Sequence, residues 1–371
     1  MNQTIVSYLS KYEFYKTLLD LFGGNESLLA FVIYLIAALV VILVCATIGG
    51  FGTYAERKIS ADLQARMGPN RVGPYGLLQV LADGIKMITK EDIMPFAADK
   101  FLFYLAPLLA LVGVFATLAV VPWSSGFALT DLNVGVFYLI AISSLVGLGI
   151  FLGGYASNSK WSMLGGMRGA SQIISYEIPV TLSVLAIVLM AGGMSFGTIV
   201  GQQKGLPFNW YLFHNPFTFI GFFVYFTGAL AETNRAPFDL PEAESELVSG
   251  YHTEYTGMRF GFFALAEYIE IFVVCGVAAA LFLGGSNLPI NINIDILPLQ
   301  FVEIIIFITK TLLLYYVVIW IRWTLPRLRV DQLMSICWKY LTPIAIFNLV
   351  GCAIWMVAFN GRSLADLIIG H

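Results

Sequence analysis

The sequence predicts an all-α membrane protein that crosses the bilayer eight times. Its 371 residues are 58% hydrophobic and only 12% charged, and its mean hydropathy of +0.82 exceeds that of a water-soluble domain of this size. The apolar residues gather in stretches of about 20, which is the helix length that crosses a hydrocarbon core about 30 Å thick. Polar and apolar residues alternate only weakly in these stretches, so helices are favoured over barrel strands.

The predicted spans form a single membrane domain with no soluble domain attached to it. They cover about residues 28–48, 101–121, 134–155, 173–190, 217–236, 260–283, 301–321 and 341–359. Residues 1–25 form a polar lead-in. The first span is too long for the core of a signal peptide, and no small-residue cleavage site follows it, so we expect no cleavable signal.

The placement of Lys and Arg predicts the orientation of the chain. The connections after the first, third, fifth and seventh spans contain 15 of the 20 Lys and Arg residues, and such residues concentrate on the cytoplasmic side of a membrane. These connections are therefore expected to face the cytoplasm, with both termini on the opposite side. An even number of spans agrees with this arrangement.

The long basic connection after the first span predicts a helix on the cytoplasmic membrane surface. The motif GPNRVGP breaks the preceding helix and sets turns. Beyond it, Gly76–Thr89 is too short to span the bilayer, and its apolar residues share one helical face, as in helices that lie in the interface. Glu56 and Arg57 stand at the cytoplasmic end of the first span. They could bind an amphipathic ligand, or this connection could simply anchor the chain to headgroups.

No pattern predicts a metal, a nucleotide or a redox centre in this chain. The four cysteines are scattered and form no C-x-x-C, and the three histidines form no H-E-x-x-H, so neither a zinc site nor an iron–sulfur site is indicated. The stretch GFGTYA (Gly50–Ala55) fits G-x-G-x-x-A. It follows a membrane helix instead of a strand, and is therefore not interpreted as a dinucleotide fingerprint.

Four carboxyl groups lie within the predicted fourth, fifth and sixth spans, at Glu177, Glu232, Glu267 and Glu270. The last two are three residues apart and occupy neighbouring positions on one helix face. An ionised group at the centre of a bilayer costs at least ~2.5 kcal/mol, so these groups need a counter-charge, a water-filled cavity or a proton. They predict a proton relay, with hydrogen bonds to the backbone as the alternative for Glu177 and Glu267.

The segment 231–255 gathers further acids between two spans, and Arg235 is its only fixed positive charge. The acids after Glu232 are Asp239, Glu242, Glu244, Glu246 and Glu254. A dense carboxylate surface at the mouth of the membrane can exchange protons with the buried Glu residues. Alternatively, Glu242, Glu244 and Glu246 form a merely solvated helix face.

Two basic residues belong to the seventh span. Lys310 lies about two turns after Glu303 and shares its face, which is compatible either with a structural ion pair or with a role in transport. Arg322 ends the span, where a long basic side chain is expected to extend to the membrane surface as an anchor.

Several motifs, in order along the chain, resemble one known family. They are AERK followed by RMGPNRVGPYGLLQVLADGIKMITKED, then SYEIP, AETNRAPFDLPEAESELVSGYHTEYTGM, LAEY and RWTLPRLRVDQLM. Together they resemble the H-type membrane component of respiratory complex I, the proton-pumping NADH:quinone oxidoreductase, whose mitochondrial counterpart is NADH dehydrogenase subunit 1. The resemblance runs from about residue 28 to 358, and the long acidic motif is highly specific.

The resemblance implies an eight-helix subunit at the heel of the L-shaped complex, which clasps the peripheral arm and forms the membrane entrance of the quinone chamber. Glu56, Arg57 and Arg66 match positions at that entrance. The acidic loop beside the chamber is matched by Asp239, Glu242, Glu244 and Glu246, with Glu254 following. The buried carboxylates that lead toward the antiporter-like subunits are matched by Glu177, Glu232 and Glu267.

Substrate and partners are also implied by the resemblance. Quinone is the substrate, and no cofactor is bound by this chain, because NADH, FMN and the iron–sulfur clusters belong to partner subunits. The expected partners are the peripheral-arm subunits around the terminal iron–sulfur cluster, the adjacent small and antiporter-like membrane subunits, and membrane lipid, with no nucleic acid. The polar lead-in favours a bacterial inner membrane over a mitochondrial one.

Two other functions remain open at this point. The first is a membrane subunit of an energy-converting hydrogenase or a related dehydrogenase, because these proteins share parts of both cytoplasmic motifs. The second is a stand-alone proton-coupled transporter. Inverted repeats would favour the transporter, and the sequence contains no clear repeat.

Overall fold

The structure is a computed structural model that describes residues 25–124, 130–205, 207–288 and 299–359, together with the single positions 15, 19 and 364. Every regular element within these ranges is a helix. The prediction of an all-α chain is therefore confirmed for the described residues. The predicted lead-in, residues 1–25, lies almost entirely outside them.

Among the described residues, seven helices are long and apolar enough to cross a membrane. They are α3 (Glu26–Leu63), α5 (Lys100–Leu118), α6 (Gly135–Ala156), α7 (Lys160–Ala191), α12 (Gly257–Phe282), α13 (Leu299–Thr324) and the continuous segment Val330–Phe359. That last segment comprises α14 (Val330–Ser335), a π-helical turn η4 (Ile336–Leu341) and α15 (Thr342–Phe359). The remaining predicted span corresponds to α10 (Pro216–Glu232), a shorter apolar helix of 17 residues.

Several helices extend beyond the spans that hydropathy predicts. Helix α3 continues to Leu63, well past the predicted end at 48, and α7 begins at Lys160 instead of 173. Hydropathy reports where a chain leaves the hydrocarbon, whereas a helix continues until a cap or a breaker stops it. The reverse holds for α10, which ends at Glu232 because residues 233–236 form a turn.

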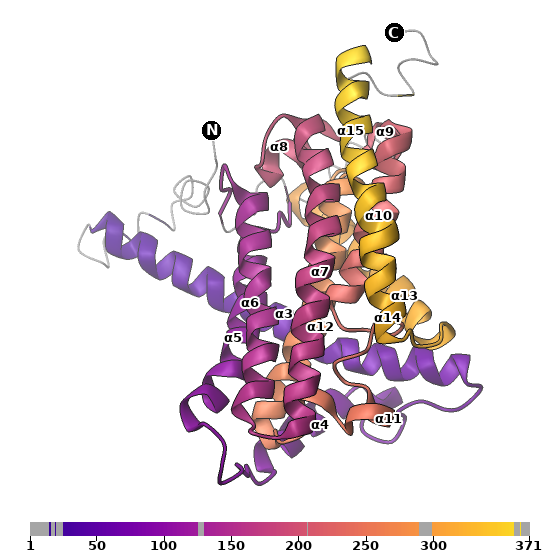
Figure 1. The fold of residues 1–371 in the computed structure, drawn as a ribbon. Helices are drawn as coiled ribbons and strands as arrows, with labels where there is room; N and C mark the ends of the chain where they lie inside the picture. The colour runs from indigo at the N-terminus through magenta and orange to yellow at the C-terminus, as the bar shows by residue number, and fades with distance from the viewer. Residues whose placement is uncertain are drawn as a thin grey trace.

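Most of the long helices run side by side as a bundle, and α3 crosses this bundle obliquely (Figure 1). Helices α4 (Gln79–Thr89) and α11 (Glu244–Leu247) lie at one end of the bundle. Helices α8 (Phe196–Gln202) and α9 (Tyr211–His214) lie at the other end. The acidic segment is thus separated by the length of the bundle from the polar connections around α8.

Small residues allow the backbones of the bundle to approach closely. A Cβ on Gly154 of α6 would lie 2.5 Å from the carbonyl oxygen of Ser162 and 2.9 Å from the Cα of Gly166 in α7. A Cβ on Gly149 would lie 2.9 Å from the amide nitrogen of Ala110 in α5. Such contacts are typical of helices that associate within a membrane.

The predicted surface helix is present as α4, although it begins at Gln79 instead of Gly76. None of its residues is buried, and its apolar face is exposed, with Leu81, Ile85 and Ile88 each more than 60% accessible. The helix is joined to α3 through Asp83, whose carboxylate lies 2.7 Å from Arg57 and 3.1 Å from Lys86. Partial burial opposes the charge on Asp83, but hydrogen bonds from Lys86, Arg57 and Gln79 lower its pKa.

Candidate functional site

A buried ion network forms where α3, α12, α13 and the turn after α10 meet. At its centre, the Arg235 side chain is only 3% exposed. Its Nε lies 2.6 Å from Oε1 of Glu267, and its Nη1 lies 3.0 Å from Oε2 of Glu56. The other oxygen of Glu56 lies 2.5 Å from Nη1 of Arg322. The guanidinium of Arg235 also stacks 4.3 Å from the ring centre of Tyr268.

The formal charges of this network balance, since two guanidinium groups face two carboxylates. Charges removed from water are retained only when such partners compensate them. Burial opposes the charge on Arg235, and the carboxylates of Glu267 and Glu56 offset this cost. Helices far apart in the sequence are thereby joined through one electrostatic cluster.

The three residues predicted at the quinone entrance separate in the structure. Glu56 points into the buried network, whereas Arg57 pairs with Asp83 of α4. Arg66, in the connection after α3, is exposed and donates to the side chain of Gln64 over 2.6 Å. Only Arg57 and Arg66 therefore remain on the outer surface.

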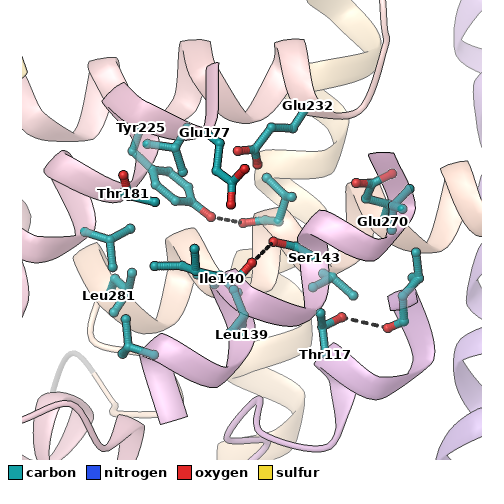
Figure 2. A pocket seen from close by; sticks show the side chains of 18 of the residues that line it. Thr117, Leu139, Ile140, Ser143, Glu177, Thr181, Tyr225, Glu232, Glu270 and Leu281 are labelled. Carbon is teal, nitrogen blue, oxygen red and sulfur yellow. Dashed lines mark hydrogen bonds between the residues drawn. The ribbon is translucent and has the colours of Figure 1, made fainter. Parts of the chain in front are cut away.

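A second group of carboxylates lines a cavity between α5, α6, α7, α10 and α12 (Figure 2). Glu177 of α7, Glu232 of α10 and Glu270 of α12 all border it. About 40 Å³ is open to the centre of a water-sized sphere. One water molecule needs roughly 10–15 Å³ by this measure, so the cavity can hold a few.

The hydroxyl groups around this cavity are already used within the protein. Thr117 and Ser143 donate to the carbonyl oxygens of their own helices, and the Tyr225 hydroxyl donates to Val274 over 3.1 Å. No side chain of the described residues donates a hydrogen bond to the three carboxyl groups. The cavity therefore offers acceptor groups that water can bridge.

The predicted chain of Glu177, Glu232 and Glu267 is divided between these two sites. Glu177 and Glu232 border the cavity, but Glu267 belongs to the ion network, and Glu270 takes the third position at the cavity. Backbone connections nevertheless join the sites. Glu232 and Arg235 are three residues apart, as are Glu267 and Glu270.

Three acids of the segment after α10 have defined partners. Asp239 lies 2.8 Å from Arg327, and Glu246 lies 2.6 Å from Arg168 of α7. Glu242 accepts a hydrogen bond from the Tyr251 hydroxyl over 3.2 Å. The Glu242 side chain is therefore partly buried, whereas the Glu246 side chain is half exposed and agrees with a solvated helix face. The side chain of Glu244 lies outside the described residues, and Glu254 is half-buried with no ion pair within them.

His252 is a second neighbour of Glu242, and its Nδ1 lies 3.6 Å from the Glu242 carboxylate. The imidazole packs edge-on against the rings of Tyr251 and Phe260. Burial in these surroundings lowers the pKa of His252 to about 4. The side chain is therefore neutral at pH 7.

The fold of the acidic segment depends on Gln172 and Gly250. The amide of Gln172 donates to the carbonyl oxygens of Ala231 and Phe238, over 2.8 and 2.7 Å. Gly250 has a φ of +61°, and a Cβ there would lie 1.6 Å from the carbonyl oxygen of Pro241. Gln172 thus holds the segment against α7, and Gly250 lets two parts of the segment approach each other closely.

The sequence did not predict most of these structural partners as functional residues. Arg322 was interpreted as a surface anchor and instead joins the buried network. Tyr268 and Gln172 have no sequence signal, whereas Arg235 had one, as the only fixed positive charge among many acids. Among the described residues, no group of three His, Cys, Asp or Glu side chains could hold a metal ion. All four cysteines are buried and free.

Fold and buried charges together define a multi-pass membrane protein that keeps ionisable groups in a protein-lined interior. A family model described as NADH dehydrogenase matches residues 35–353. The chain belongs to this family, as an H-type membrane component of NADH-quinone oxidoreductase.

Curated relatives support this assignment over most of the chain. The H-type component of NADH-quinone oxidoreductase from Anaeromyxobacter dehalogenans is 43% identical, over 87% of this chain and 81% of that protein. The proteins of the same description from Chlorobaculum tepidum and Brevibacillus brevis are 45% and 48% identical, and the matches cover 92% and 94% of those proteins. The resemblance stated from the motifs is confirmed. The chain is a membrane subunit of NADH-quinone oxidoreductase, and its partners are the other subunits of complex I.

Proposed function

We propose that this subunit forms the membrane entrance of the quinone chamber, docks the peripheral arm, and couples quinone reduction to proton translocation through its buried carboxylates. Quinone is the substrate, and NADH, FMN and the iron–sulfur clusters belong to partner subunits. Electrons would reach the quinone from the terminal cluster of the peripheral arm. The part played by this chain is binding, positioning and proton exchange.

The proposal includes an orientation in a bacterial inner membrane. Helix α10 acts as the eighth span, and the end of the bundle with α4 and α11 faces the cytoplasm. The basic residues of the connections support this direction. The relatives named above are bacterial. Both termini then lie on the opposite side, and the adjacent small and antiporter-like subunits share the membrane.

The exposed apolar face of α4 supports a role at the quinone entrance. This face can lie among lipid tails with its polar face at the headgroups. Arg57 pairs with Asp83 of this helix, and Arg66 is exposed on the same connection. A quinone that leaves the lipid phase would slide its apolar tail along α4 while its polar headgroup passes these arginines.

The observation that carries the coupling proposal is the adjacency of the ion network and the carboxylate cavity on α12. Glu267 pairs with Arg235, and Glu270 borders the cavity three residues further along the same helix. Charges so close together in a medium of low dielectric titrate as a group. A change in charge beside Arg235 would therefore change the proton occupancy of the cavity.

The acidic segment extends this group toward the proposed quinone chamber. Asp239, Glu242 and Glu246 are each held by a named partner. The charges of Asp239 and Glu242 also act on Glu267 of the network. We propose that reduction of the quinone changes the protonation of this segment, and that the change passes through Glu267 to Glu177, Glu232 and Glu270.

Substitution of the carboxylates tests this function. The variants Glu177→Gln, Glu232→Gln and a combined Glu242→Gln, Glu244→Gln and Glu246→Gln are expected to assemble into complex I but to lose quinone reduction coupled to pumping. NADH-driven quinone reduction and proton uptake are measured together in inverted membrane vesicles. The exposed Glu26→Gln, in the first turn of α3, serves as the matched control. Native turnover and native pumping in all these variants would remove the proposed coupling role.

A further inference from the structure

At the end of α12 opposite the acidic segment, a lysine occupies a cage of backbone carbonyl groups. Lys310 belongs to α13, and its Nζ donates to the carbonyl oxygens of Leu283, Gly285 and Asn287 over 2.7, 2.9 and 3.0 Å. An ammonium group has three N–H donors, so all of its protons are used by this cage. Neither the predicted ion pair with Glu303 nor proton transport is needed to explain this lysine.

The cage exists because of the way α12 ends. The left-handed residues Gly284 and Gly285 reverse the chain, and the amide of Gly285 binds the carbonyl oxygen of Ala279 over 2.8 Å. This reversal brings the carbonyl groups of Leu283, Gly285 and Asn287 toward one point. The end of a helix also carries a partial negative charge, so a cation is stabilised there.

The polar side chains around the cage form hydrogen bonds to other groups, so the three carbonyl oxygens bond to Lys310 without competition from them. Gln203 is fully buried and donates to the carbonyl oxygens of Ala280 and Leu281 over 3.1 and 3.2 Å. Its own oxygen accepts from the amide of Gly284 over 3.0 Å. Asn287 is held by its side chain, which donates to Val200 over 2.6 Å. The cage is therefore a built structure with fixed ligands.

An aromatic ring closes the remaining side of the cage. Nζ of Lys310 lies 4.3 Å from the centre of the Trp210 ring, within the distance at which a ring face attracts a cation. The indole packs closely on the turn, since a Cβ on Gly284 would lie 2.7 Å from its Nε1. Carbonyl oxygens and a tryptophan face together form an environment that suits a monovalent cation.

We propose that the carbonyl groups of Leu283, Gly285 and Asn287 and the ring of Trp210 form a binding site for a monovalent ammonium-type cation, which the side chain of Lys310 fills in the native protein. This internal cation fastens α13 to the end of α12. Glu267 and Glu270 lie near the middle of the same helix, so this contact also restrains the helix that carries them.

Chemical rescue in the intact complex tests the site. In Lys310→Ala the methylene groups beyond Cβ and the ammonium group are both absent, which leaves room for ethylammonium. We expect a lower thermal midpoint of the purified complex and a recovery of more than half of that loss in ethylammonium chloride, since a ligand that binds the folded state stabilises it. Tetramethylammonium chloride at equal ionic strength is expected to restore nothing, because it has no N–H donor.

Two controls separate the cation site from general effects. Lys310→Met fills the space of the lysine methylene groups but has no charge, so ethylammonium has no room to bind. The thermal midpoint of this variant is therefore expected to fall and not to recover in ethylammonium chloride. The exposed Lys204→Ala, near the same end of the bundle, is expected to keep the native midpoint in every salt. Equal action of the two ammonium salts on Lys310→Ala, or a native midpoint for Lys310→Met, would overturn the proposal.

The ring provides a second measurement if Lys310→Ala does not assemble. With Lys310 present, the midpoint is expected to decrease in the order native, Trp210→Phe, Trp210→Leu, because phenylalanine keeps part of the attraction to a cation and leucine keeps none. Equal midpoints for the phenylalanine and leucine variants would show that no cation is held by the ring, and the proposal would fail.

Discussion

The guanidinium of Arg235 lies 2.6 Å from the carboxylate of Glu267, and both residues belong to segments that hydropathy assigns to membrane spans. Since Arg235 also pairs with Glu56, its removal leaves two buried carboxylates short of a partner. Breaking a buried pair in this way costs about 3–5 kcal/mol. Arg235→Gln is therefore expected to reduce strongly the amount of assembled complex in membranes.

Arg235→Lys is expected to give an intermediate amount of assembled complex. Lysine keeps the positive charge, but its single ammonium group cannot contact both carboxylates as the planar guanidinium does. Assembly is measured by quantifying the complex after native gel electrophoresis of solubilised membranes. Arg71→Gln, at an exposed position after α3, should assemble as the native protein does. A native level of complex with Arg235→Gln would show that the network does not hold the helices together.

In the structure Glu270 lines the cavity and has no ion pair with any described residue of the network. Its replacement therefore tests the cavity while the ion network keeps all its members. Glu270→Gln is expected to lower pumping-coupled turnover by at least roughly tenfold, because a positioned proton-transfer group typically contributes about 10²–10⁴-fold to a rate. The double variant with Glu232→Gln is expected to be scarcely slower than either single variant, because groups that act as a unit are not additive. Quinone reduction and proton uptake in vesicles measure both effects.

Glu26→Gln is again the matched control, and its turnover should equal that of the native protein. Losses that multiply in the double variant would show that Glu270 and Glu232 act independently. In that case the three carboxyl groups would share a cavity without forming one proton-exchanging unit.

Hydropathy predicted the membrane helices well because a segment that crosses lipid must consist mainly of apolar residues, and hydropathy measures this composition directly. It could not predict that α3 continues to Leu63 or that α10 ends at Glu232, since caps and turns decide these ends. The length of α3 matters for the site, because the part of this helix beyond the apolar stretch carries Glu56 into the network.

Spacing within one helix was a weaker guide to the site. Glu267 and Glu270 are three residues apart, and about 60° separates their directions around a helix of 3.6 residues per turn. That angle is enough to direct Glu267 to Arg235 and Glu270 to the cavity. Arg322 comes from the end of α13, and Tyr268 of α12 contacts Arg235 from the turn after α10, so only the assembled fold reveals these contacts.

The low pKa of His252 predicts an acid-sensitive loop. Burial lowers this pKa to about 4, against an ordinary value of 6.5. Above pH 6.5 the imidazole is neutral in both the folded and the unfolded loop and contributes no pH dependence. As the pH falls from 6.5 to 4, only the unfolded loop binds the proton, so this contribution to stability is progressively lost. Below pH 4 the loss is complete.

The measurement is the thermal midpoint of the purified complex between pH 7 and pH 4, for the native protein and for His252→Phe. Phenylalanine fits the aromatic surroundings of Tyr251 and Phe260 but cannot bind a proton. We expect a flatter decline in the variant. Parallel curves for the two proteins would show that His252 is not held neutral in the folded loop.

Gly250 allows the acidic segment to lie against the backbone before it. A Cβ at this position would lie 1.6 Å from the carbonyl oxygen of Pro241, and the φ of +61° disfavours any other residue. Gly250→Ala must therefore move the chain next to Glu242, at a cost above ~1 kcal/mol from backbone strain alone. Quinone reduction in membrane vesicles, normalised to the amount of assembled complex, is expected to fall severely.

Gly201→Ala, whose Cβ would meet nothing within 4 Å, should keep native activity. If both alanine variants were equally active, the position of Glu242 would not matter for the reaction, and the acidic segment would have no part in the proposed coupling.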